Sequence, residues 1–266
     1  MQLGGTRVLV TGASGGIGQA VARALHGRGA RVLLSGRRAE VLDELATELG
    51  GNAEVLEADL AERAGSVSLA QRAGDVDVLV ANAGLPASGR LEKFTPEEID
   101  RALEVNLRAP IQLTRALVPG MVERRRGHLV FVSSLNGKVA TARSALYSAT
   151  KFGLRGFAGG LREDLHGSGV GVTVVFPSFI SDAGMFAETG TRLPTGVATR
   201  SPEQVAAAVV RGIERDRGEI DVAPLFMRTS AWLAGISPGA VTAMARRLGS
   251  EKVAAELGER QKHKRA

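Results

Sequence analysis

The sequence contains no cysteine, and this absence excludes several kinds of chemistry. Without a thiol the protein cannot form a disulfide, hold zinc through thiolates or use a cysteine nucleophile, so it depends on no particular redox compartment. The chain also lacks any run near the roughly 18 apolar residues that cross a bilayer, and Met1 to Gly5 lack the charged and apolar parts of a signal peptide. We therefore expect a cytoplasmic protein.

Aromatic residues make up only 4% of the chain, so few side chains could stack on the bases of a nucleic acid. Lysine and arginine exceed aspartate and glutamate by 34 to 28, giving a formal net charge of +6. The basic residues form no dense patch: Arg124 to Arg126 make a short cluster, and Arg260, Lys262, Lys264 and Arg265 make a basic tail. Because stacking residues and a binding motif are missing as well, we expect no nucleic-acid partner and interpret the tail as solvated.

Histidine is also rare. The four histidines, His26, His128, His166 and His263, are scattered without the spacing of metal ligands. We therefore expect no metal site.

What the sequence does contain is an alternation of short aliphatic runs with helix-like stretches, which is typical of a parallel sheet joined by crossover helices. The predicted strands are Arg7–Val10, Arg31–Leu34, Ala53–Glu57, Val76–Ala81, His128–Val132, Gly171–Phe176 and Glu219–Val222. The predicted helices are Gly16–Gly27, Ala39–Leu49, Glu62–Arg72, Pro96–Arg126 with a break, Ala145–His166 and Pro202–Asp216. We predict one doubly wound α/β domain of seven mainly parallel strands with helices on both faces. It spans 1–224, includes a substrate loop at 183–199, and is followed by a C-terminal extension at 225–266.

A glycine-rich segment follows the first strand and opens the first helix. The segment Thr11 to Gly18 reads TGASGGIG. Glycines let the backbone approach a diphosphate, and the free N–H groups at a helix start attract its charge, so the segment predicts a dinucleotide site. The predicted contacts are Gly12, Ser14, Gly15, Gly16, Ile17 and Gly18. By itself such a glycine cluster could also be only a tight turn.

The end of the second strand bears on the choice of cofactor. An NAD-selective site of this kind places an acid there, whereas this chain has Arg37 and Arg38. A guanidinium matches a 2′-phosphate, so we expect NADP(H) to be preferred, with NAD(H) possible. The alternative is that both arginines only cap a surface loop.

The only tyrosine, Tyr147, lies four residues before Lys151 in a predicted helix. This spacing places the phenol and the ammonium on one face. A nearby ammonium should lower the pKa of the phenol towards the working range and make Tyr147 a general acid or base. Ser134 lies at the end of the preceding strand, where a hydroxyl can polarise a carbonyl. A Tyr/Lys pair at this spacing also arises on ordinary helix surfaces.

In combination these residues resemble the short-chain dehydrogenase/reductase family. The resemblance rests on TGxxxGIG at Thr11 to Gly18, NAG at Asn82 to Gly84, Ser134, and YxxxK at Tyr147 to Lys151, and it covers about Arg7 to Phe186. It implies a Rossmann-type fold and reversible hydride transfer between a nicotinamide and a carbonyl or secondary alcohol.

The resemblance also implies roles for individual residues. Ser134 would orient the substrate oxygen, Tyr147 would exchange the proton, and Lys151 would lower the pKa of the tyrosine and bind the nicotinamide ribose. Asn106 would break its helix and position a proton-relay water. Further cofactor contacts would come from Asp59, Leu60, Asn82, Ala83, Gly84, Pro177 and Ile180.

Three features depart from the family pattern. Pro177 is followed by serine where glycine is common, and Asp182 stands where a threonine is expected. Gly15 occupies the place of a basic residue that NADP-dependent members often carry, so phosphate recognition would rest on Arg37 and Arg38. The long ending after the seventh strand suggests a different assembly from the common tetramer.

The sequence says less about the substrate and the partners than about the fold and the cofactor. Residues that would surround the site suggest a mostly apolar small-molecule carbonyl or alcohol: Leu85, Leu135, Val139, Met185 and Phe186. The apolar C-terminal residues favour a homo-oligomer, a dimer or a tetramer. Two alternatives stay open: a catalytically silent NADPH-binding regulatory protein, and a membrane-peripheral or polyanion-binding protein that uses Trp232, Leu233 and Ile236.

Overall fold

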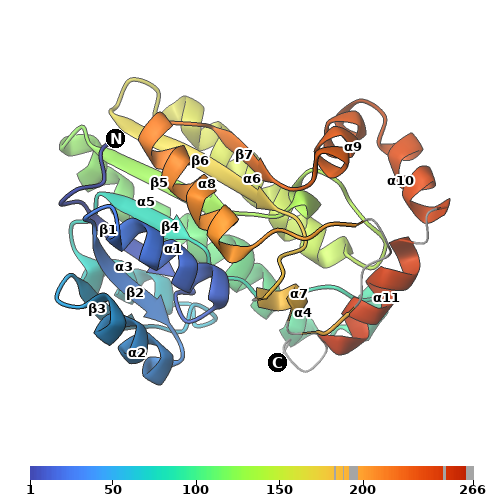
Figure 1. Cartoon of the computed structure of the whole chain (residues 1–266), viewed down its shortest axis with the longest axis horizontal. Coiled ribbons are helices and arrows are strands. Elements are labelled where there is room, and N and C mark those ends of the chain that lie inside the picture. Colours follow the sequence, from blue (N-terminus) through green and yellow to red (C-terminus); the bar gives the residue numbers. More distant parts are fainter. Residues whose placement is uncertain (183, 188, 192–196, 248–249, 262–266) are drawn as a thin grey trace.

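The computed structural model describes residues 1–182, 184–187, 189–191, 197–247 and 250–261 (Figure 1). Parts of two predicted segments lie outside the described residues. These are residues 183, 188 and 192–196 of the substrate loop, and Lys262, Lys264 and Arg265 of the basic tail, together with His263.

Within the described residues, seven strands form one sheet in the order β3-β2-β1-β4-β5-β6-β7, and each neighbouring pair is parallel. The strands are β1 Arg7–Thr11, β2 Arg31–Gly36, β3 Ala53–Glu57, β4 Val78–Ala81, β5 Gly127–Val132, β6 Val170–Pro177 and β7 Glu219–Val222. The prediction of a doubly wound parallel sheet is confirmed. The strand order reverses direction between β1 and β4, and folds of this kind bind ligands at that point, beyond the carboxyl ends of the strands.

Helices cover both faces of the sheet because successive strand residues point to opposite faces. On one face, Val8 and Val10 of β1 pack with α1 (Gly16–His26), α2 (Ala39–Leu49) and α8 (Pro202–Arg215). On the other, Leu9 packs with α3 (Gly65–Ala73), α5 (Ala109–Glu123) and α6 (Ala145–Asp164). The two apolar cores hold the helices against the sheet. Figure 1 shows these helices around it.

Several predicted boundaries were wrong. The third helix begins at Gly65 and not at Glu62, because residues 59–64 form a turn in which the Asp59 carboxylate accepts from the backbone N–H of Ala61 at 2.9 Å. The fourth strand begins at Val78 and not at Val76. The long helix predicted to end at Arg126 ends at Glu123, and the other predicted boundaries lie within two residues of the observed ones.

The long helix predicted with a break is two helices joined by a π-helical turn. Its parts are α4 (Pro96–Leu103), the turn η2 (Glu104–Arg108) and α5. Asn106 lies in η2, so the predicted break at this residue is confirmed. Such π-turns often occur at functional sites.

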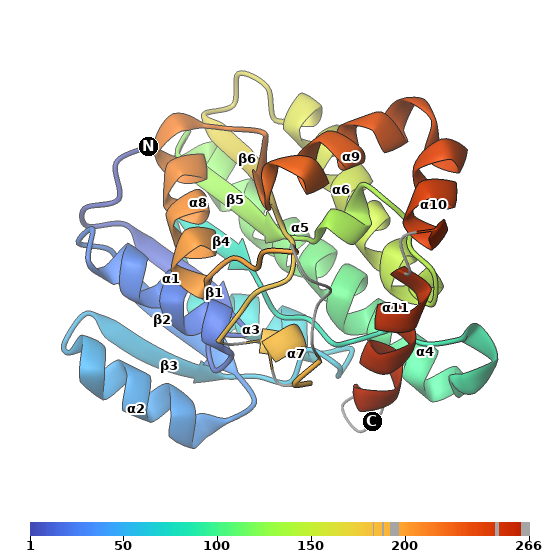
Figure 2. The ribbon, with the colours of Figure 1, turned by 45° about the vertical axis from the view of Figure 1, so that its right-hand side comes forward.

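The described residues of the C-terminal extension form three helices, α9 (Leu225–Ile236), α10 (Pro238–Arg247) and α11 (Ser250–Arg260). Both Figure 1 and Figure 2 show α11 beside the short helix α7 (Gly184–Ala187) and α4. The Arg260 guanidinium donates to the carbonyl of Thr189 at 2.8 Å, and the Gln261 amide donates to the carbonyl of Met185 at 3.1 Å. The end of the chain is therefore tied to the predicted substrate loop. No helix of the described residues has the length and apolar character to cross a membrane.

His128 lies in the buried strand β5. Its side chain is 2% exposed, and its Nε2 lies 2.8 Å from the Thr173 hydroxyl oxygen. Because that hydroxyl donates to the carbonyl of Arg217 at 2.7 Å, it must accept from His128, which places the imidazole proton on Nε2. Burial lowers the pKa of His128 to about 4, although Asp216 opposes the shift.

We expect the folded protein to lose stability as the pH falls from about 6.5, the ordinary histidine pKa, to about 4. The unfolded chain binds a proton at His128 within this range and the folded chain does not, so the loss reaches about 3 kcal/mol at most. Urea unfolding at a series of pH values measures it. His128→Gln should flatten this part of the profile, whereas His166→Gln, at an exposed position, should not. An equal effect of both substitutions would contradict the assignment.

Candidate active site

The candidate site lies at the carboxyl edge of the sheet, where the ends of β1 and β4 are tied together. The Thr11 hydroxyl oxygen accepts from the backbone N–H groups of Asn82 and Ala83, each at 3.1 Å. In return, the Asn82 amide donates to the carbonyls of Thr11 at 3.1 Å and Gly12 at 3.2 Å. Sequence reasoning named Asn82 only as a cofactor contact and gave Thr11 no role of its own. The contact shows that both residues hold the glycine-rich loop.

The glycine-rich loop then turns directly into α1. Gly12 has a φ of +66°, and a Cβ atom there would lie 2.8 Å from the Cα of Ala83. Gly15 precedes α1 without a capping side chain, and the first turn, from Gly16 through Gly18, holds no acid. By contrast, α4 and α8 both begin with complete capping boxes. The open N–H groups at the start of α1 fit the diphosphate of a dinucleotide.

The end of β2 supplies positive charge beside this loop. Arg38 donates to the carbonyl of Ser14. Arg37 is exposed, and it has no ion pair or side-chain hydrogen bond to any residue that the structure describes. At the end of β3, the half-buried Asp59 and the buried Leu60 lie at the same edge of the sheet. These positions fit an adenosine 2′-phosphate near Arg37.

The residues around the predicted reaction centre come from β5, α6 and η2. Lys151 of α6 is 3% exposed, and its ammonium donates to the carbonyl of Val132 at 3.1 Å. The Ser133 hydroxyl donates to the carbonyl of Lys151 at 3.2 Å, a support that sequence reasoning missed. The Lys151 Nζ lies 5.6 Å from the centre of the Tyr147 ring, and Tyr147 forms a hydrogen bond with Ser134. Ser134, Tyr147 and Lys151 are therefore brought together as predicted.

Asn106 completes this group from the other side. Its side chain is 1% exposed, accepts from the N–H of Leu85 at 2.7 Å and donates to the carbonyl of Leu85 at 2.9 Å. A Cβ atom on Gly84 would lie 3.4 Å from the Asn106 amide oxygen and 3.8 Å from the Lys151 Nζ. Gly84 therefore separates Asn106 from Lys151, and both polar groups of the Asn106 side chain are already bound.

The ionisation of this group differs from the prediction. Loss of contact with water raises the pKa of Tyr147 to about 12, and the hydrogen bond with Ser134 opposes the shift only in part. Burial also lowers the pKa of Lys151 to about 8. The pKa of Tyr147 in the protein without cofactor therefore lies above its ordinary value and not below it as expected, because desolvation is the largest influence on this phenol.

Because Tyr147 is the only tyrosine, its ionisation can be followed by tyrosinate absorbance. We expect the cofactor-free protein to titrate with a midpoint near pH 12, against about 10 for the same chain unfolded in urea. Circular dichroism at each pH verifies that the fold persists. A midpoint at or below that of the unfolded chain would contradict the effect of burial.

The segment after β6 borders a cavity of about 430 Å³, lined in part by Asp182, Phe186 and Thr199. Pro177 ends β6, and Ile180 is buried. Its neighbours Phe179 and Ser181 exchange backbone hydrogen bonds with Arg200, whereas the backbone of Ile180 has no such bond to the described residues. The amide of Ile180 is therefore free for a ligand. Asp182 is exposed, with a φ of +64°.

No group of three or more histidine, aspartate or glutamate side chains able to hold a metal ion occurs in the described part of the chain.

Comparison with known proteins decides the family. The family model described as short chain dehydrogenase matches residues 6–193. The chain belongs to the short-chain dehydrogenase/reductase family. This match covers β1 to β6 and every residue of the candidate reaction centre.

Relatives and solved structures agree with this family. Ketoacyl reductase HetN of Nostoc sp. is 36% identical over 227 residues, which cover 83% of this chain and 79% of the relative. Dehydrogenase/reductase SDR family member 7B of Bos taurus is 33% identical over 252 residues, 87% of this chain and 78% of the relative. The closed form of serine dehydrogenase complexed with NADP⁺ is 32% identical, with a TM-score of 0.75 over 83% of this chain and 95% of the other. As a short-chain dehydrogenase/reductase, the protein is an oxidoreductase that uses a nicotinamide cofactor.

Proposed function

We propose that the protein is an NADP(H)-preferring oxidoreductase that transfers a hydride between the nicotinamide and a carbonyl or secondary alcohol. The observation that carries the proposal is the convergence of Ser134, Tyr147 and Lys151 at the end of β5, opposite Asn106. A surface Tyr/Lys pair would not have a buried ammonium held by the backbone of the central sheet. The catalytic assignment rests on this arrangement.

The proposed mechanism gives each side chain one task. When bound, the nicotinamide supplies or accepts the hydride. Ser134 hydrogen-bonds the substrate oxygen and orients it towards Tyr147. The phenol gives its proton to that oxygen during reduction and takes it back during oxidation. A pKa of about 12 keeps Tyr147 protonated before reduction, so that the proton is in place.

Lys151 and Asn106 act on this proton transfer without donating to the substrate. The Lys151 ammonium stabilises the tyrosinate that remains after reduction and hydrogen-bonds the nicotinamide ribose. The Asn106 side chain uses one N–H and one lone pair to bind Leu85, so its second N–H and second lone pair are the groups that would hold the relay water.

The cofactor is proposed to lie across the carboxyl edge of the sheet. The diphosphate would contact the loop from Gly12 through Ser14, Gly15, Gly16 and Ile17 to Gly18. Arg37 and Arg38 would bind the 2′-phosphate, Asp59 and Leu60 the adenine, and Asn82 to Gly84 the adenosine ribose. Pro177 and the backbone of Ile180 would contact the nicotinamide amide.

We expect Tyr147→Phe to reduce kcat by about 10²- to 10⁴-fold, because the substitution removes the proton donor and keeps the ring. NADPH oxidation with a panel of ketones measures the effect. The affinity for NADPH, measured by reduced-nicotinamide fluorescence, should stay unchanged and serves as the control. Unchanged turnover would contradict the role of Tyr147.

Arg37→Gln should weaken NADPH binding by about ten- to hundredfold, the usual worth of hydrogen bonds to a charged group. NADH has no 2′-phosphate, so its affinity should not change. Arg31→Gln is the matched control, because Arg31 is exposed at the opposite end of β2. Parallel fluorescence titrations with both cofactors measure the difference. Tighter binding of NADH than NADPH by the unmodified protein would contradict the proposed preference.

The C-terminal extension, 225–266, is proposed as an assembly element attached to a catalytic domain, 1–224. Trp232 and Ile236 of α9 are 69% and 67% exposed, and Leu233 beside them is also exposed. A homo-oligomer would cover these side chains, and sedimentation analysis tests for it. Insertion of the same residues into an anionic membrane surface is the alternative, which a vesicle co-sedimentation assay would reveal.

A further inference from the structure

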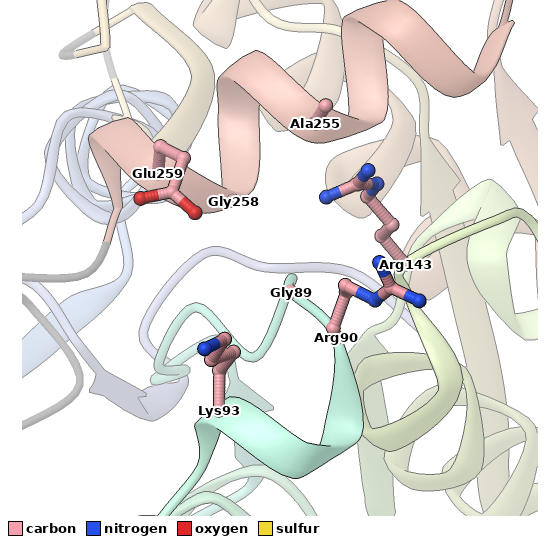
Figure 3. A pocket seen from close by; sticks show the side chains of 7 residues that line it. All are labelled: Gly89, Arg90, Lys93, Arg143, Ala255, Gly258 and Glu259. Carbon is pink, nitrogen blue, oxygen red and sulfur yellow. The ribbon is translucent and has the colours of Figure 1, made fainter.

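A second cavity, of about 210 Å³, lies against α11 (Figure 3). It is lined by four charged side chains and by the backbone where Gly258 of α11 meets Gly89. The charged residues are Arg90, Lys93, Arg143 and Glu259, and Gly89 and Gly258 lie between them. Lys93 belongs to the short helix η1 (Leu91–Lys93). The nicotinamide chemistry proposed above uses none of these residues.

The lining carries more positive than negative charge. Three cations face a single carboxylate, that of Glu259. Arg90 forms an ion pair with Glu92 at 2.7 Å, but Lys93 and Arg143 have no ion pair or side-chain hydrogen bond to any residue within the described ranges. In Figure 3 the guanidinium groups of Arg90 and Arg143 lie on one side of the cavity, and Lys93 lies across it, beneath Glu259. Such a group of unpaired donors favours an anion.

Two segments connect this cavity to the candidate reaction centre. One begins at Leu85, which Asn106 holds, and reaches the cavity at Gly89; four residues span at most about 14 Å. The other carries Arg143 two residues before α6, the helix of Tyr147. The Gly89 N–H donates to the carbonyl of Arg143 at 2.6 Å and joins the two segments. The cavity therefore lies close to the reaction centre, within about 14 Å of Leu85 along the chain.

The backbone of Arg143 is held in an uncommon conformation. Its φ is +56°, in the left-handed region that bulky residues rarely adopt. Strain of this kind persists where the surrounding structure imposes it, and it gathers at ligand-binding positions. The bond from Gly89 holds the carbonyl of Arg143, and the Arg143 side chain lines the cavity.

Helix α11 forms the outer wall of the cavity. A Cβ atom on Gly258 would lie 3.2 Å from the Cα of Gly89, so the absence of a side chain allows this close contact. The next turn of the chain bonds the substrate loop through Arg260 and Gln261. The same helix therefore borders the cavity and holds Met185, which approaches Gly84 at the reaction centre.

We propose that this cavity binds an anionic group of the substrate, a carboxylate or a phosphate. Arg143 and Lys93 bind the anion directly, Arg90 adds a second guanidinium, and Glu259 opposes it. The substrate is then a carbonyl compound or alcohol with an anionic group some distance from the reacting carbon, and not an apolar molecule throughout. This inference rests on the proposed oxidoreductase function, whose site supplies the reacting end.

Matched substrate pairs test the proposal. One series contains straight-chain oxo acids of increasing length and their methyl esters, and a second contains a hydroxyketone phosphate and its parent hydroxyketone. We expect the anionic member of at least one pair to have the higher kcat/KM. Arg143→Gln should lower that value by about ten- to hundredfold and leave the neutral member unchanged. The series with the larger preference identifies carboxylate or phosphate as the group.

Two further variants separate charge recognition from general damage. Glu259→Gln removes the carboxylate of the lining and should raise kcat/KM for the anionic member only. Arg211→Gln, at an exposed position on α8, should change neither member. Equal kcat/KM for both members of every pair, or an equal loss for both in Arg143→Gln, would overturn the anionic subsite while leaving the oxidoreductase function intact.

If no substrate pair is turned over, that result counts against the proposed oxidoreductase function. A binding measurement then tests the anionic subsite by itself. Phosphorus NMR of inorganic phosphate, added to protein saturated with NADPH, reports the subsite without catalysis. Line broadening that is lost in Arg143→Gln and kept in Arg211→Gln supports the subsite. Broadening that persists in Arg143→Gln, or is absent from the unmodified protein, overturns it.

Discussion

The hydrogen bonds between Thr11 and Asn82 fix the point on which the rest of the site depends. They join the ends of β1 and β4, where the strand order of the sheet reverses. Because the Asn82 amide holds the carbonyls of Thr11 and Gly12, the glycine-rich loop can keep a positive φ at Gly12 and present the start of α1. The same segment continues through Gly84 to Leu85, which Asn106 binds. One polar contact thus relates the cofactor loop to the reaction centre.

Loss of contact with water is the largest influence on the pKa values of Tyr147 and Lys151 in the reaction centre. An ammonium with one neutral partner is costly away from water, so the pKa of Lys151 falls to about 8. The same loss of water raises the pKa of Tyr147 to about 12. The phenol therefore keeps its proton until a substrate oxygen can accept it. Stabilisation of the tyrosinate by Lys151 matters only after that proton has left.

Sequence reasoning predicted the features that depend on local spacing. The glycine-rich loop, the Tyr147 to Lys151 interval and the break at Asn106 each lie within one short segment, and the structure places them as expected. Features that depend on packing between distant segments were missed or wrong. The pKa of Tyr147 reflects how completely neighbouring segments remove the phenol from water, which no interval along the chain encodes. The bond between Ser133 and the backbone of Lys151 joins residues that are far apart in sequence.

The C-terminal extension was the least predictable part for a related reason. Helix α10 buries none of its described side chains, so no fully buried apolar side chain among them determines its place. The place of α11 depends on polar contacts with Thr189 and Met185, more than 70 residues earlier in the chain. Those contacts place Gly258 against Gly89. They complete the cavity lined by Arg90, Lys93 and Arg143, the candidate site for an anion.

The central claim is that the protein passes a hydride between NADPH and a carbonyl carbon. The most direct test is to supply NADPH that carries deuterium at the transferable position of the nicotinamide and to analyse the alcohol product by mass spectrometry. The account predicts that deuterium appears on the carbinol carbon of the product, and that Tyr147→Phe forms this labelled alcohol about 10²- to 10⁴-fold more slowly. Oxidation of NADPH without deuterium in the alcohol would contradict it.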